Sequence, residues 1–231
     1  MTEVNRCKNC NSELVGLYCF ECGQKNIESF TFSRLVKDFF DNIFSLDSRL
    51  FQTFKFLIIR PGFLTNEYWS GKRITYLPPF RLYLLTSILF FFIPHPDYQY
   101  GAEEFYPLLQ RGIFVLMPCM ALILLILYRK NNLLYFHHFI TTLHFHSFMF
   151  FMLAINDILL YPFDREIPIL NNIFALIILI YLFFMLKNIY IESLKRVVIK
   201  FALLICMYGA LFLSTAIIIA IYVKQLRVGG S

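Results

Sequence analysis

Four cysteines near the start of the chain have the spacing of a metal centre. Cys7, Cys10, Cys19 and Cys22 form two C-x-x-C pairs within CKNCNSELVGLYCFECG. A C-x-x-C turn presents two sulfurs to one ion, and zinc prefers four thiolates in a tetrahedron. Because four cysteines leave no open coordination position, the pattern predicts one structural zinc ion and no catalytic metal. Two disulfides are the competing interpretation, which a reducing cytosol disfavours.

The residues around these cysteines support a small zinc ribbon, which we place at residues 1–28. Asn11 and Gly23 follow the two pairs, and both residue types tolerate the left-handed backbone that a zinc knuckle needs. The basic residues of the ribbon are few: Arg6, Lys8 and Lys25. Nucleic acid is therefore not expected as a direct partner, and a protein partner on the cytosolic side is.

A second group of polar residues lies within an apolar stretch, LLYFHHFITTLHFHSFMFF, which holds four of the five histidines. His137 and His144 are seven residues apart and share a helix face with Thr141, whereas His146 lies about 160° around the helix from His144. Ionisable groups within a membrane span usually face the bundle interior or a water-filled path. The open alternatives are a pore or proton path along His137, Thr141 and His144, a metal site completed by another helix, or neutral imidazoles that hydrogen-bond to neighbouring helices.

Other catalytic patterns are weak, and we expect no enzyme. SGKR does not match a phosphate-binding loop, since residue 66 is Asn where that pattern needs Gly, and Arg73 follows the lysine. No carboxylate lies in the middle of an apolar stretch to complete a metal site, and Ser147 beside His146 is too weak a pairing for acyl transfer. An intramembrane enzyme or transporter that uses the histidines is the alternative function.

Composition identifies the elements that must position these groups as membrane helices. Hydrophobic residues make up 58% of the 231 residues and charged residues only 16%, whereas a soluble domain carries about a quarter charged residues. The sequence therefore predicts an all-α polytopic membrane protein. We expect five transmembrane helices of a bundle that covers 77–228: 82–94 with 77–80 as its lead, 112–128, 133–155, 169–186 and 197–223. The closing Gly-Gly-Ser, 229–231, is expected to be a cloning scar.

Basic residues indicate the orientation, because short basic loops stay cytosolic. They collect before the first span, between the second and third, and between the fourth and fifth. The intervening loops are acidic. We therefore expect a multi-pass protein of the bacterial inner membrane with a cytosolic N-terminus.

The stretch SGKRITYLPPFR leads into the first span. Lys72, Arg73 and Arg81 are expected at the membrane interface, where cations meet lipid phosphates. Pro78 and Pro79 restart the helix because they lack N–H donors. For Arg81 we expect a side chain that snorkels to the interface, and a pair buried inside the bundle is the alternative.

Before this stretch, 29–76 carries two apolar stripes at helical spacing, which predict amphipathic helices on the membrane surface or against the bundle. The first stripe consists of Leu35, Val36, Phe39, Phe40, Ile43 and Phe44. The second consists of Leu50, Phe51, Phe54, Leu57 and Ile58.

The order CFECGQK, DFFDNIFSLDSRLFQT and RPGFLTNEYWSGKRITYLPPFRLYLLTS, with the later LHFHSF, resembles a family of uncharacterised bacterial membrane proteins, common in Bacteroidetes, with an N-terminal zinc ribbon. The resemblance covers about 7–150 and implies an architecture but no reaction. In size and layout the chain is also similar to the small membrane accessory proteins of subtype VI-B CRISPR systems. The expected function is thus a non-enzymatic membrane protein, either a channel-like oligomer or an adaptor that engages a partner, in CRISPR-linked antiviral defence.

Overall fold

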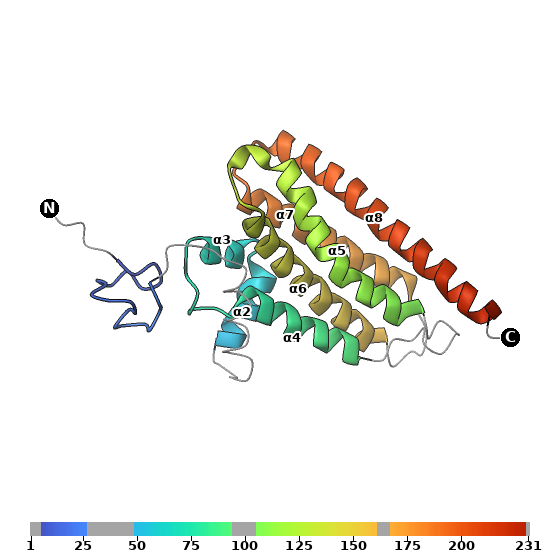
Figure 1. Cartoon of the computed structure of the whole chain (residues 1–231), viewed down its shortest axis with the longest axis horizontal. Helices are drawn as coiled ribbons and strands as arrows, with labels where there is room; N and C mark the ends of the chain where they lie inside the picture. Colours follow the sequence, from blue (N-terminus) through green and yellow to red (C-terminus); the bar gives the residue numbers. More distant parts are fainter. Residues whose placement is uncertain (1–5, 27–48, 94–104, 161–166, 230–231) are drawn as a thin grey trace.

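The computed structural model describes residues 6–26, 49–93, 105–160 and 167–229, and the chain is all-helical in these ranges (Figure 1). The helices are α2 (Arg49–Ile59), α3 (Phe63–Trp69), α4 (Pro79–Phe92), α5 (Phe105–Leu127), the 3-10 helix η2 (Arg129–Asn131), α6 (Tyr135–Leu160), α7 (Pro168–Ile189) and α8 (Leu194–Gly229). These ranges hold no β-strand, only two isolated bridges near the N-terminus. The expected all-α class is confirmed. The first predicted amphipathic helix lies outside the described residues.

Helix α6, which carries the four histidines, lies at the centre of the bundle. Helices α4, α5 and α7 pack against it, and α8 packs against α5 and α7 (Figure 1). Two thirds (67%) of the most apolar stretch of α6 is buried, against 28% for α7 and 6% for α8. The polar groups of α6 therefore face protein, while α7 and α8 carry most of the exposed apolar surface.

The number of membrane-spanning helices differs from the prediction. Three helices of the described chain are long and apolar enough to cross a membrane: α6, α7 and the Leu194–Gln225 part of α8. Helix α4 has 14 residues, about 21 Å, which is shorter than a hydrocarbon core of about 30 Å. Helix α5 has 23 residues, about 35 Å, and its described apolar stretch is Gly112–Leu127. Three of the five predicted spans are therefore supported by length and composition in the described chain, and a membrane crossing by α4 and α5 stays a prediction.

Helix α2 lies against the bundle through a face that is turned slightly from the predicted stripe. Leu57 is buried, but Phe51 is 81% exposed. Thr53, and not Phe51, is buried on this face. The Thr53 hydroxyl donates to Arg49 O (2.7 Å) and accepts from Leu77 N (3.0 Å). Tyr181 of α7 donates to Leu57 O at 2.8 Å. Polar contacts to the segment before α4 and to α7 thus decide which face of α2 is buried.

Gly62 joins α2 to α3 against the end of α7. Its φ is +84°, and a Cβ there would lie 3.0 Å from Ile189 Cγ1 and 3.1 Å from Met185 O. Asn188 of α7 donates to Pro61 O (2.9 Å), and Asn66 of α3 donates to Asn188 O (3.1 Å). Only glycine combines this backbone conformation with such a close approach. The turn therefore fixes the α2–α3 pair to the bundle.

Candidate metal centre

The four predicted cysteines lie on two turns with matching backbone hydrogen bonds. Asn11 N donates to Cys7 O and Gly23 N donates to Cys19 O, both at 2.9 Å. Asn11 has φ 65° and Gly23 has φ 71°, so both take the left-handed backbone that the sequence predicts. Each turn thus directs two sulfurs of a C-x-x-C pair to the same side.

The two turns repeat after 12 residues, the distance from Cys7 to Cys19 and from Cys10 to Cys22. Cys7 N donates to Ser12 O and Cys19 N donates to Gln24 O, both at 2.8 Å. The antiparallel bridges Arg6–Glu13 and Tyr18–Lys25 show the same offset. The cysteine module, residues 6–26, is therefore two copies of one knuckle that face each other.

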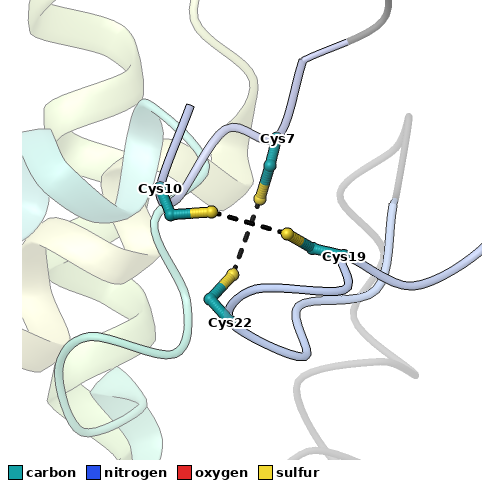
Figure 2. A group of neighbouring side chains, drawn as sticks. All are labelled: Cys7, Cys10, Cys19 and Cys22. Atoms are coloured by element: carbon teal, nitrogen blue, oxygen red, sulfur yellow. Dashed lines mark hydrogen bonds between the residues drawn. The ribbon is translucent and has the colours of Figure 1, made fainter. Parts of the chain in front are cut away.

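The sulfurs meet in the arrangement that one zinc ion requires. Cys7 Sγ lies 3.6 Å from Cys22 Sγ, and Cys10 Sγ lies 3.4 Å from Cys19 Sγ (Figure 2). All four sulfurs lie within 4.8 Å of one another. Zn–S bonds of about 2.3 Å in a tetrahedron place sulfurs about 3.8 Å apart. A disulfide needs about 2.05 Å, and all four cysteines are free. The residues therefore fit a zinc site of four thiolates and do not form the two disulfides.

The hydroxyl of Ser12 lies between two of the sulfurs, 3.0 Å from Cys10 Sγ and 3.0 Å from Cys19 Sγ. Hydrogen bonding to Ser12 lowers the pKa of Cys10 and lowers the pKa of Cys19 to about 6. Burial raises the pKa of Cys22 to about 12. Since zinc binds thiolates, the ion must displace the Cys22 proton, whereas Cys19 is already stabilised as the anion.

The cysteine module is docked onto the turn between α3 and α4. Gln24 Nε2 donates to Gly71 O (2.8 Å), and its Oε1 accepts from Arg73 N (3.1 Å). Thr75 donates to Asn9 Oδ1 at 2.8 Å. Gln24 is buried, so both bonds of its amide are shielded from water. The bonds connect both knuckles to the turn before α4, the second through Gln24 and the first through Asn9.

The three basic residues predicted at the membrane interface occupy different surroundings. Lys72 forms an ion pair with Glu67 at 2.6 Å. The Arg73 guanidinium lies 5.7 Å from the ring centroid of Tyr68. Arg81 on α4 is only 5% exposed, so its side chain is buried within the described chain. The structure therefore does not bring the three cations together.

The histidines of α6 reach neighbouring elements. His144 Nδ1 shares a hydrogen bond with Thr65 Oγ1 of α3 at 3.0 Å. The His137 ring lies edge-on to Trp69, also of α3, with 5.4 Å between the ring centroids. Thr141 between them donates to His137 O at 3.0 Å. His137 and His144 thus share a face, as their spacing predicts, and that face is covered by α3.

The other two histidines have partners that the sequence did not reveal. His138 Nδ1 shares a 2.6 Å hydrogen bond with Tyr190 OH, beyond the end of α7. His146 Nε2 shares a 2.9 Å hydrogen bond with Tyr208 OH of α8. Their spacing on α6 gave no signal of these tyrosines, which lie 52 and 62 residues further along the chain.

Tyr190 is the centre of an aromatic cluster at the end of the bundle nearest the cysteine module. Its ring stacks on Tyr128, with centroids 3.6 Å apart and planes 12° apart, and Trp69 lies 6.1 Å away. The Lys200 ammonium lies 4.1 Å from the centroid of the Tyr128 ring. Burial raises the pKa of Tyr128 and Tyr190, so both phenols stay protonated. The cluster connects α3, the α5–α6 turn, α6, the α7–α8 turn and α8.

Comparison with known proteins places one part of the chain in context. No curated protein and no solved structure matches the chain. Residues 47–91, which include α2, α3 and all but the last residue of α4, are similar to a family described as a protein of unknown function (DUF3667).

Proposed function

We propose that the protein is a non-enzymatic adaptor of the bacterial inner membrane, whose zinc-stabilised cysteine module presents a surface to a cytosolic partner protein. In this proposal α4 to α8 form the membrane bundle, with the short α4 completed by flanking residues or tilted among the longer helices. Four thiolates around one ion leave no position for a substrate, so the zinc acts by folding the module.

The observation that carries the proposal is the exposed tip of the docked cysteine module. Gln24 fixes the module to the α3–α4 turn, as described above. The side chains of Val15 and Phe20 are 93% and 95% exposed, and those of Leu17 and Tyr18 are 71% and 60% exposed. Large apolar side chains that are exposed close together in the sequence of a docked module are typical of a protein-binding surface.

The distribution of basic residues supports a cytosolic position for this module. The Tyr128–Tyr190 stack brings the turn after α5 and the turn after α7 together, and Trp69 joins them beside the module. Basic residues of these turns and of the first turns of α8 lie at this same end: Arg129, Lys130, Lys187, Lys195, Arg196 and Lys200. Positive charge marks the cytosolic side of an inner-membrane protein.

Serine replacements at the tip should separate partner binding from folding. In a Val15→Ser, Phe20→Ser variant we expect a crosslinked partner to fall at least about tenfold, because buried aromatic anchors dominate interface energies. Zinc content and membrane insertion should stay at wild-type levels. The measurement is quantitative mass spectrometry of the purified protein after crosslinking in its native host.

Ile191→Ser is the matched control for the tip variant. Ile191 is 97% exposed at the α7–α8 turn, at the same end of the molecule, but outside the module. Its replacement should leave the partner in place. Equal capture by wild type and the tip variant would reject the adaptor surface. The first partner to look for is the RNA-guided nuclease of a subtype VI-B CRISPR system, because of the resemblance in size and layout.

A channel-like oligomer is the second candidate, and the concentration of histidines on the central helix favours it. Purified protein in liposomes should then conduct ions, and His137→Gln with His144→Gln should reduce the flux at least about tenfold, since a lining group interacts directly with the ion. The control is His146→Gln, whose ring hydrogen-bonds to α8 instead of facing α3. The absence of flux in wild type across several ions and voltages would remove this candidate and also disfavour a histidine-based transporter.

A further inference from the structure

A small hollow lies where the cysteine module meets the α3–α4 turn. It has a volume of about 40 Å³, more than the roughly 10–15 Å³ that a cavity needs in order to hold one water molecule. Three cations line it: Lys8 and Lys25 from the module and Arg73 from the turn. Among the described residues, none of those that line it is acidic. Glu67 of α3, which precedes the turn, is paired with Lys72 at 2.6 Å.

The backbone of the turn holds one of these cations in place. Gly71 has φ +96°, and a Cβ there would lie 2.9 Å from Lys8 Cδ and 3.1 Å from Lys8 Cβ. The aliphatic part of the Lys8 side chain therefore packs against the Cα of Gly71. The hydrogen bonds from Gln24 to the backbone of Gly71 and Arg73 are made at the same turn. A glycine is required here both for its backbone conformation and for this close approach.

Trp69 of α3 adds a hydrogen-bond donor to the lining of the hollow. Trp69 contributes to the hollow, and its Nε1 is buried without a hydrogen-bond acceptor among the described residues. An unpaired buried N–H costs about 1–3 kcal/mol, so such a group commonly marks a site for a ligand or a water. The lining thus combines three cations with the N–H group of Trp69, which has no acceptor among the described residues. Both polar atoms of the Gln24 amide already bond to the turn.

We propose that this hollow binds a phosphate-type anion through Lys8, Lys25 and Arg73. Phosphate oxygens accept several charge-assisted hydrogen bonds, which lysine and arginine side chains supply. Lys8 and Lys25 are exposed, so the rest of a larger molecule can extend outward between them. A phospholipid headgroup and a free phosphate share this chemistry. The site adjoins the proposed adaptor surface, since the Lys25 ammonium lies 5.7 Å from the ring centroid of Tyr18, but it involves different residues from the Val15 and Phe20 of the tip variant.

Lys8, Lys25 and Arg73 could instead balance the negative charge of a zinc–thiolate centre, which is the competing role of these cations. A zinc ion with four thiolates carries a net charge of −2, and Cys7 itself lines the hollow. In that role the lysines would support zinc retention and bind no anion. The two roles therefore differ in two measurable quantities, anion affinity and zinc content.

The test is isothermal titration calorimetry on the full chain, zinc-loaded, in a neutral detergent. The probes are inorganic phosphate and dihexanoyl phosphatidate, with dihexanoyl phosphatidylcholine as the zwitterionic reference. We expect wild type to bind at least one of the two anions, and Lys8→Gln with Lys25→Gln to weaken that binding at least about tenfold, the change expected when two charge-assisted contacts are lost. Competition between the two anions would assign the site to phosphate in general, and binding of phosphatidate alone would assign it to a headgroup.

Lys130→Gln with Lys187→Gln is the control, since it removes the same charge from exposed positions at the same end of the bundle. It should leave the affinity within about twofold of wild type, because exposed charges at a distance are largely screened. If the Lys8, Lys25 variant loses its zinc, Arg73→Gln, which lies outside the module, replaces it with the same criterion. No anion binding by wild type, or equal weakening in test and control variants, would overturn the proposal.

Discussion

Replacing Cys19 and Cys22 with serine is expected to abolish zinc binding and unfold the cysteine module. Wild type, purified under reducing conditions, should carry about one zinc ion per chain, and the variant close to none. The effect should be large because a structural zinc contributes about 10–16 kcal/mol of folding free energy in modules of this kind. Beyond Cys7 and Cys19, residues 6–26 bury no hydrophobic side chain that could replace it. Metal analysis and hydrogen exchange of this segment measure the two effects.

Two cysteines outside the centre provide the control. Cys119 of α5 and Cys206 of α8 are free and belong to no group of metal-ligating residues in the described chain. Their replacement by serine should leave both zinc content and hydrogen exchange of the module unchanged. Wild-type protein without metal under reducing conditions would contradict the zinc assignment. Zinc that persists in the Cys19, Cys22 variant would contradict it as well.

Gly62→Ala is expected to destabilise the bundle by about 2–5 kcal/mol. A left-handed backbone costs a residue with a Cβ about 1–2 kcal/mol. In addition, the new methyl group would meet Met185 O at 3.1 Å, a backbone atom of a packed helix that cannot easily move, and overpacking adds about 1–3 kcal/mol. The measurement is the midpoint of thermal unfolding in detergent, which should fall by several degrees.

Gly209→Ala is the matched control on α8. No atom lies within 4 Å of the position where its Cβ would be, and its backbone is helical. Alanine there should leave the unfolding midpoint unchanged or raise it, because glycine within a helix is less favourable than alanine by about 0.5–1 kcal/mol. If both variants unfolded at the wild-type temperature, the close contact of the α2–α3 turn with α7 would be refuted.

The cysteine centre was the part of the protein most accessible from sequence, because its chemistry is local. Two C-x-x-C pairs, each followed by a residue that tolerates left-handed backbone, are enough to specify two knuckles. The docking of the module was not predictable in the same way. Gln24 bonds to backbone groups of residues 71 and 73, almost 50 residues further along, and nothing in the type of either partner marks the pairing.

The histidines show the same limit. Helical periodicity correctly places His137 and His144 on one face of α6, because that relation depends on the helix alone. The partners of His138 and His146, Tyr190 and Tyr208, depend on how α7 and α8 pack, which a single sequence does not encode in any short pattern. A cluster of polar residues within an apolar stretch therefore predicts contacts between helices, but does not say which helices supply them.

Whether α4 crosses a membrane was less accessible from the sequence. An apolar stretch shows where a helix is tolerated in lipid but not where its backbone starts and stops. Pro79 fixes the start of α4 inside the apolar stretch, and Ile93 takes an extended backbone after Phe92. Pro118, by contrast, lies within α5 without ending it. The same residue type thus begins one helix and is accommodated inside another, according to whether neighbouring helices support the backbone.

Trp69 has a spectroscopic consequence, because it is the only tryptophan of the chain. Its indole lines the hollow under the cysteine module and lies edge-on to His137 and near Tyr190. Excitation at the long-wavelength edge of protein absorption, where only tryptophan absorbs, therefore produces fluorescence from Trp69 alone. The emission wavelength reports whether the module covers the indole, and the quantum yield reports the neighbouring imidazole. The native chain thus contains its own fluorescent label for the contact between the cysteine module and the helical bundle.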